Sequence, residues 1–286
     1  MRLRLFAAAF VTALLASSCG PEEETSTVRV AAYNVLFGNW GTPERIGEMF
    51  EPHGFDIIGF SEVPEGDWTA KVGKVLGLDY SYVGKISSAN HKDKYKSILS
   101  RTPLKNVHEI EITADGWSPA SLVAADTRVR GLELRVYSLH IPGRPGFTDQ
   151  ADGSAAEFIA AQVIPGIDAE RFIMIGDFNN HLGDAPLNLI EKAGLRATWH
   201  DLDFDVTVHS SHRHIETGAE SGVIDHIYYN VASGAGATSG GIIHDAYNPP
   251  AEDKPMPRYR TEWDKYGKPL SDHRPVWAEL SFATSP

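Results

Sequence analysis

Apolar residues occur in short runs along the chain, and these runs alternate with stretches of helical pattern. Buried strands are predicted over 28–36 and 56–60, because β-branched and other apolar residues dominate both runs. Between them, Thr42 and Pro43 suit an N-cap and the first position of a helix. A helix is therefore predicted from Thr42 to about His53.

The rest of the chain continues this alternation. Turn residues separate the runs, and no internal repeat of about 20–50 residues is visible. Paired strands together with strand–helix–strand units predict an α/β protein with mixed sheets. The further predicted elements are helices over 66–78, 150–164 and 186–193, and strands over 81–85, 97–101, 107–112, 121–127, 132–140, 171–178, 223–230 and 275–282.

Length and composition agree with one soluble catalytic domain. The chain has 286 residues, of which 42% are hydrophobic and 22% charged, which excludes a disordered or fibrous protein. Its formal net charge is −12, so the overall positive charge typical of nucleic-acid-binding proteins is absent. A bound dication can still supply positive charge locally, so a nucleic-acid substrate is not excluded.

The N-terminal residues have the layout of a secretory signal. Arg2 and Arg4 precede an apolar run over 5–15, which is too short to span a membrane. Cys19, the chain's single cysteine, follows small residues in a pattern that resembles a lipoprotein signal with a lipidated cysteine. Cleavage nearby without a lipid is the alternative. We expect an exported protein that is periplasmic, anchored to the cell surface or extracellular, with a signal peptide over 1–18, a linker over 19–27 and a catalytic domain over 28–286.

Strong apolar strands repeatedly end in residues that bind metals or transfer protons. Such side chains, if they meet at one edge of a sheet, need a cation or reciprocal hydrogen bonds. Carboxylates, amides and imidazoles without cysteine suit Mg²⁺ or Mn²⁺ better than structural zinc. Each residue alone also fits a structural role, such as a cap or a solvated loop carboxylate. The set is Asn34, Glu62, His140, Asp177, Asn179, Asp225, Asp272 and His273.

The segments that carry these residues resemble the endonuclease/exonuclease/phosphatase superfamily, which includes deoxyribonuclease I-like enzymes. The resemblance implies a four-layer α/β sandwich: two packed mixed β-sheets, flanked by helices, with the site at one end. It also implies hydrolysis of phosphate mono- or diesters by metal-assisted attack of water. The matching segments are AAYNVLFGN, IIGFSEV, SILSRTPL, YSLH, MIGDFNN, IDHIYYN and SDHRPV, in the family's order.

The resemblance further implies a metal site and a base. Glu62 corresponds to the principal ligand of Mg²⁺ (or Mn²⁺), with Asn34 and Asp272 in or beside the coordination shell. Asp177 corresponds to the residue that orients or deprotonates water, and Asn179 to an amide donor for a phosphate oxygen. The number of metal ions and the identity of the base stay open.

The remaining catalytic positions implied by the resemblance include two histidines. His273 corresponds to a residue that contacts the phosphate or shares in activating water, and Asp225 to the carboxylate that fixes its tautomer. His140 corresponds to a phosphate-contacting histidine of the deoxyribonuclease branch, where it protonates the leaving group.

The substrate is a phosphate ester, with DNA and RNA as candidates. Inositol phosphates are disfavoured, because GDFNNHL and IDHIYYN lack the arginines of that branch. Two alternatives stay open: a lipid-directed phosphodiesterase of the sphingomyelinase type, and a non-catalytic phosphate-binding member. The complete residue set favours catalysis. A lipid anchor would bring the protein to a membrane surface, and no obligate protein partner is evident from the sequence.

Two polar segments have two interpretations each. Lys92, Lys94 and Lys96 are placed either to line a phosphate track or to form a solvated basic turn. The segment 209–221 either supplies substrate contacts, with Arg213 as the substrate-binding residue, or is a surface loop.

Overall fold

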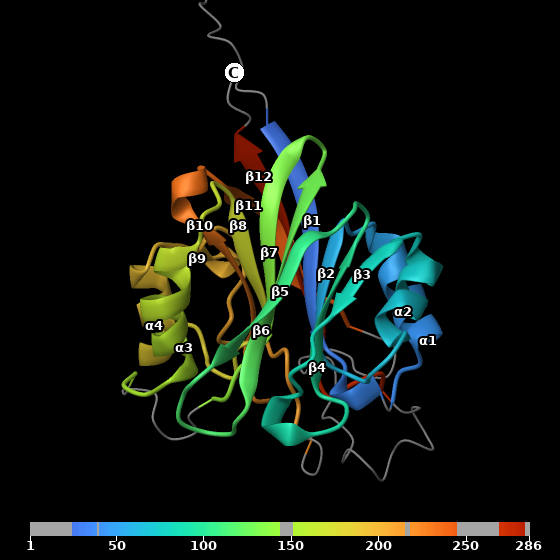
Figure 1. The fold of residues 1–286 in the computed structure, drawn as a ribbon, viewed down its shortest axis with the longest axis horizontal. Coiled ribbons are helices and arrows are strands. Elements are labelled where there is room, and N and C mark those ends of the chain that lie inside the picture. Colours follow the sequence, from blue (N-terminus) through green and yellow to red (C-terminus); the bar gives the residue numbers. More distant parts are fainter. Residues whose placement is uncertain (1–24, 39, 144–150, 215–217, 245–268, 284–286) are drawn as a thin grey trace, which may run out of the picture.

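Four layers make up the fold (Figure 1). The computed structural model describes residues 25–38, 40–143, 151–214, 218–244 and 269–283. Two six-stranded sheets pack face to face, and helices cover the outer face of each. This confirms the predicted α/β sandwich. The predicted signal peptide and Cys19 lie outside the described residues. Within those residues, no helix is long and apolar enough to cross a membrane.

The first sheet has the strand order β11-β12-β1-β2-β4-β3. β1 runs parallel to β2 and antiparallel to β12, and Thr25 pairs with Ala283 at one end. Asn34 therefore lies at the opposite end of this sheet. The strands are β1 (Thr25–Asn34), β2 (Ile57–Val63), β3 (Tyr80–Val83), β4 (Tyr95–Ser100), β11 (Gly236–Ile242) and β12 (Val276–Ala283).

The second sheet has the strand order β5-β6-β7-β8-β10-β9. β7 and β8 are parallel, and their last residues, His140 and Asp177, are paired. β10 is antiparallel to β8, and its first residue, Asp225, pairs with Asp177. The register thus places three polar residues side by side. The strands are β5 (Lys105–Ile112), β6 (Ala120–Val129), β7 (Leu132–His140), β8 (Phe172–Asp177), β9 (Leu195–Ala197) and β10 (Asp225–Asn230).

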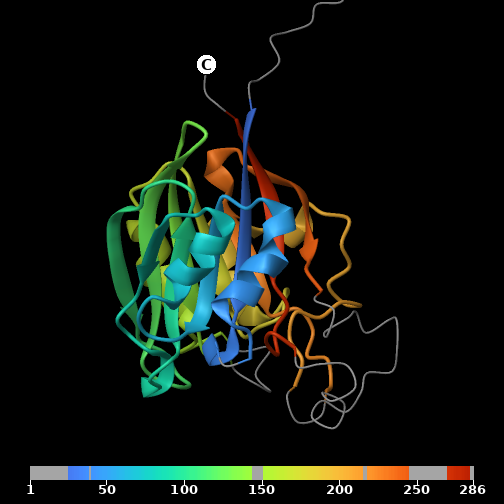
Figure 2. The same cartoon turned by 90° about the vertical axis from the view of Figure 1, so that its right-hand side faces the viewer.

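Among the described residues, four α-helices cover the sheets, with α1 and α2 on the first and α3 and α4 on the second (Figures 1 and 2). The Thr42 hydroxyl accepts a hydrogen bond from the backbone N–H of Arg45, which confirms the predicted N-cap. The helix predicted over 150–164 is divided: α3 leads into a π-helical turn over Ile159–Val163 and a 3₁₀ turn over Ile164–Gly166. The α-helices are α1 (Pro43–Phe50), α2 (Trp68–Leu76), α3 (Ala155–Phe158) and α4 (Ala185–Lys192).

The main apolar core lies between the sheets, and a smaller one lies between the first sheet and its helices. Gly59 on β2 shows how closely the sheets approach each other. A Cβ atom there would lie 2.7 Å from Cδ1 of Ile175 on β8, so a larger side chain would require the facing Ile175 side chain to shift.

Candidate active site

Side chains from both sheets meet at Asp177, at the end of β8. Asn34, the last residue of β1, donates from Nδ2 to Oδ2 of Asp177 over 2.9 Å. Nε2 of His140 and Nε2 of His273 lie 3.6 and 3.7 Å from the same oxygen. The structure thus brings together four of the residues that the sequence predicted for the site.

Asp177 is 1% exposed, which changes its acidity. Burial raises its pKa, and the negative charge of Asp225 raises it further. The charge of His273 and hydrogen bonds from Asn34 and from the backbone N–H of Asn179 oppose this rise without cancelling it. A carboxylate whose pKa is raised towards neutrality is suited to accept a proton from water.

His273 is the second buried titratable group of the site. Its Nδ1 donates to Oδ2 of Asp225 over 2.8 Å, and the hydroxyl of Ser211 donates to the same oxygen over 2.7 Å. Burial alone lowers the pKa of His273, but the charges of Asp225 and Asp177 outweigh burial and raise it. His273 is therefore an imidazolium at neutral pH, with Nε2 facing Asp177.

His140 has the opposite protonation. Burial lowers its pKa well below the usual value, and the charges of Lys96 and Lys94 lower it further. Its ring lies 4.8 Å from that of Trp117, and no described residue forms a hydrogen bond with its Nδ1. A neutral imidazole favours hydrogen bonding over the delivery of a proton from a cationic ring.

Glu62 occupies an irregular part of β2. Its φ angle is 54°, in the left-handed region, where the register of β2 with β4 shifts between Phe60 and Val63. Oε1 of Glu62 accepts a hydrogen bond from Nζ of Lys94 over 3.1 Å. Oε2 is buried and has no hydrogen-bond partner among the described residues. A cation would satisfy this oxygen.

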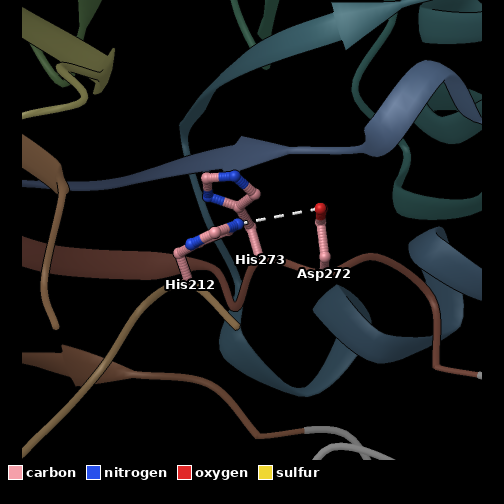
Figure 3. A group of neighbouring side chains, drawn as sticks. All are labelled: His212, Asp272 and His273. Atoms are coloured by element: carbon pink, nitrogen blue, oxygen red, sulfur yellow. Dashed lines mark ion pairs between the residues drawn. The ribbon is translucent and has the colours of Figure 1, made fainter. Parts of the chain in front are cut away.

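A loop brings a third histidine to the site (Figure 3). His212 forms a β-bridge with His273, and the two ring centroids are 4.5 Å apart. Nε2 of His212 lies 3.8 Å from Oδ2 of Asp272, and its Nδ1 lies 2.9 Å from the hydroxyl of Ser221. His212 therefore has one ring nitrogen held by its own loop and the other directed towards Asp272.

The donor set fits a divalent cation. Two groups of side chains each place one possible ligand atom per residue within 4.8 Å of one another: His212, Asp272 and His273, and Asp177, Asp225 and His273. Together with the unpartnered Oε2 of Glu62, they offer oxygen and nitrogen donors of the kind that Mg²⁺ and Mn²⁺ accept.

Asn179 lies beside the site, whereas Arg213 is buried within its own loop. Asn179 has φ 50°, and its Nδ2 donates to the carbonyl of Ile141 over 3.0 Å, beside the site. Arg213 is 3% exposed, and its Nε donates to the carbonyl of Gly218 over 2.9 Å. The guanidinium of Arg213 thus contacts its own loop, and its predicted contact with substrate stays a prediction.

Sequence reasoning did not assign three residues that contact the site: Lys94, Trp117 and His212. Lys94 and His212 stand in the two segments for which a surface role was equally acceptable. Trp117 lies between β5 and β6, where no motif marks it. Only the tertiary structure brings these residues to Glu62, His140 and Asp272.

Solved structures with the same fold include several proteins. An endonuclease/exonuclease/phosphatase family protein from Bacteroides thetaiotaomicron is 18% identical, with a TM-score of 0.64 over 91% of this chain and 100% of that chain. A mannosyl-6-phosphatase from the same organism is 18% identical, with a TM-score of 0.58 over 88% and 99%. TDP2 from D. rerio, complexed with a single-stranded DNA product, is 15% identical, with a TM-score of 0.61 over 89% and 99%. These likenesses concern the fold.

No curated protein sequence matches the chain. A sequence model, described as the endonuclease/exonuclease/phosphatase family, matches residues 31–273. The match extends from β1 to His273 and includes the strand ends that meet at Asp177. The chain therefore belongs to the endonuclease/exonuclease/phosphatase family, whose members are phosphoesterases and nucleases.

Proposed function

We propose that the protein is an exported, divalent-metal-dependent phosphoesterase in which Asp177 acts on the attacking water. The observation that carries the proposal is the convergence on one buried carboxylate. Oδ2 of Asp177 receives the amide of Asn34 from one sheet and faces His140 from the other and His273 from the C-terminal segment. Burial of that carboxylate raises its pKa into the range that suits a general base.

The metal is Mg²⁺ or Mn²⁺, held by Glu62 with Asn34 and Asp272 in or beside its coordination shell. The unpartnered Oε2 of Glu62 and the place of Asp272 in a group of three possible ligands support this assignment. When bound, the ion would withdraw charge from the phosphoryl group and from the departing oxygen.

The remaining residues bind phosphate and direct protons. Asp177 would accept a proton from water as the new P–O bond forms and the ester P–O bond breaks. The imidazolium of His273, held by Asp225, would donate from Nε2 to a phosphate oxygen. His140, which is neutral, would donate a further hydrogen bond, and the amide of Asn179 would hold another oxygen. Protonation of the leaving oxygen is thereby assigned to water or to His273.

The substrate class and the location are further parts of the proposal. Nucleic acid is one candidate, and a lipid phosphodiester or a small phosphate ester is another. Export, with lipidation at Cys19 or with release of an unlipidated protein, stays a prediction from the N-terminal sequence.

The proposal is tested by hydrolysis with the purified protein in Mg²⁺ or Mn²⁺ and in excess EDTA. The panel contains supercoiled DNA, single-stranded RNA, sphingomyelin, and aryl phosphate mono- and diesters. We expect metal-dependent hydrolysis that EDTA abolishes and added metal restores. Glu62→Gln should lower the rate by at least about a hundredfold, because it removes the buried charge that holds the cation. Glu65→Gln, at an exposed position nearby, is the matched control.

The outcomes separate the candidates. Cleavage of DNA or RNA assigns a nuclease, whereas cleavage of sphingomyelin alone assigns the lipid-directed alternative. Hydrolysis that persists in EDTA contradicts metal dependence. If no ester is cleaved although the metal binds, a non-catalytic phosphate-binding role replaces the proposal.

A further inference from the structure

Three lysines that alternate in the sequence have three different environments. Lys92 is exposed, Lys96 is fully buried, and the Lys94 side chain is 19% exposed at the edge of the site. A solvated basic turn would leave all three in water. The segment therefore directs two of its three lysines inward: Lys96 into the interior and Lys94 towards Glu62 at the edge of the site.

Buried contacts hold the backbone that carries Lys94. Nζ of Lys96 donates to the carbonyl of Ile86 over 2.7 Å, and Ser87 accepts the backbone N–H of Lys94 over 3.0 Å. The backbone N–H of Ser88 in turn donates to the carbonyl of Lys94 over 3.1 Å. These bonds hold the 3₁₀ turn over Ser88–Asn90 and the backbone of Lys94 in place.

The ammonium group of Lys94 contacts a carboxylate and an aromatic face. It lies 3.1 Å from Oε1 of Glu62 and 4.5 Å from the ring centroid of Phe37. Nε2 of His140 lies 3.7 Å from the same oxygen of Glu62, so Lys94 and His140 both lie close to one carboxylate oxygen. An anion that binds His140 is therefore within reach of Lys94.

Charge makes this lysine important for substrate binding. Four buried carboxylates, those of Glu62, Asp177, Asp225 and Asp272, repel phosphate. A dication held by Glu62 would attract phosphate and repel the ammonium of Lys94, and an anion between the two cations satisfies both. A phosphate monoester carries close to two negative charges at neutral pH and a diester carries one, so an added cation favours the monoester.

We propose that Lys94 binds a non-bridging oxygen of the substrate phosphate and makes the site selective for phosphomonoesters. This inference rests on the proposed phosphoesterase function and names its substrate class. Three observations carry the assignment: Lys94 pairs with Glu62, its ammonium lies against the ring of Phe37, and His140 lies close to the same oxygen of Glu62.

The test combines binding with kinetics in wild type, Lys94→Met, Lys94→Arg and the control Lys92→Met. Inorganic phosphate is titrated calorimetrically into the metal-loaded proteins, and kcat/KM is measured for 4-nitrophenyl phosphate and for bis(4-nitrophenyl) phosphate. Lys94→Met should weaken phosphate binding and lower kcat/KM for the monoester by about tenfold or more, with less than about a threefold loss for the diester. Lys94→Arg should retain most of both, and Lys92→Met should equal wild type.

Two results overturn the inference. Equal losses on both esters in Lys94→Met show that Lys94 acts through Glu62 rather than on the substrate. Unchanged binding of inorganic phosphate shows that it does not contact phosphate. If the wild type cleaves no ester of the whole panel, the proposed function fails, while the phosphate titration still decides whether Lys94 contacts phosphate. Melting temperatures close to wild type confirm that the variants are folded.

Discussion

The active-site end of the sheets and the core beside β10 each bury a histidine, and the two differ in charge. His273 is held by Asp225 and faces Asp177, and these carboxylates raise its pKa. His226 is the next residue along β10 from Asp225 and is fully buried, yet burial lowers its pKa to about 4. Burial to a similar extent therefore gives an imidazolium in one place and a neutral ring in the other.

The hydrogen-bond partners explain this difference. Trp199 donates from Nε1 to Nδ1 of His226 over 3.1 Å, so Nε2 of His226 carries the proton and donates to the carbonyl of Asn180 over 2.9 Å. These neutral partners satisfy both ring nitrogens without any charge. The side chain of Asp225 bonds to His273, on the other segment. The alternation of a β-strand thus separates a catalytic position from a structural one between adjacent residues.

The largest effect is expected from a substitution that breaks the charged pair of Asp225 and His273. Asp225→Asn removes the anion that holds the His273 imidazolium, so kcat should fall by about a thousandfold. His226 should keep its tautomer, because its partners are unchanged. The measurement is kcat with saturating metal and substrate, with Asp203→Asn at an exposed position as control. Turnover near the wild-type level in Asp225→Asn would remove Asp225 from the mechanism.

A smaller effect concerns stability as a function of pH. His226 has a pKa of about 4 in the folded protein and 6.5 when unfolded, so below pH 6.5 the unfolded state binds a proton that the folded state does not. His226 therefore contributes about 3 kcal/mol to the free energy of unfolding above pH 6.5, and this contribution is lost as the pH falls towards 4. Urea unfolding from pH 7 to pH 4 measures this loss.

His226→Gln provides the comparison for that experiment. Glutamine offers a donor and an acceptor but does not titrate in this range. The free energy of unfolding of this variant should fall less between pH 7 and pH 4 than that of wild type, even if it is lower at pH 7. Parallel curves for the two proteins would show that another group controls acid stability.

The smallest effect is expected from a substitution that removes one hydrogen bond to the neutral ring of His226. Trp199→Phe deletes the Nε1–H donor to His226 and should lower the free energy of unfolding by about 1 kcal/mol, with activity retained. Nitrogen NMR of His226 reports whether Nε2 still carries the proton. A loss of activity in this variant would show that the core histidine communicates with Asp225.

Much of the fold was predictable from the sequence, because its central strands are apolar and β-branched. The predicted strand over 132–140 coincides with β7, and the helix from Thr42 contains α1. β11 was not predicted, since its sequence GATSGGI has little strand propensity and pairs with β12 through backbone bonds. β9, with three residues, is too short to form a pattern.

Some residues of the candidate site were predictable from the sequence, and others were not. His140, Asp177 and Asp225 end or begin regular strands of one sheet, so their convergence follows from its register. Asn34 ends a strand of the other sheet and reaches Asp177 through the packing of the two sheets. Lys94 and His212 come from irregular segments, and the sequence of such a segment does not show which way a side chain points. Their contacts depend on tertiary anchors, such as Lys96 beneath one segment and the β-bridge to His273 beside the other. Periodicity cannot reveal such contacts.

The left-handed backbone of Glu62 has a consequence for how this protein can be altered. A residue with a side chain is strained in this conformation by about 1–2 kcal/mol, whereas glycine adopts it readily. A design procedure that optimises heat resistance alone would therefore replace Glu62 early, and so remove a carboxylate with a buried oxygen that has no hydrogen-bond partner among the described residues. Under the proposed function, the natural sequence keeps a strained φ angle at Glu62 for the sake of a metal ligand and gives up some resistance to heat.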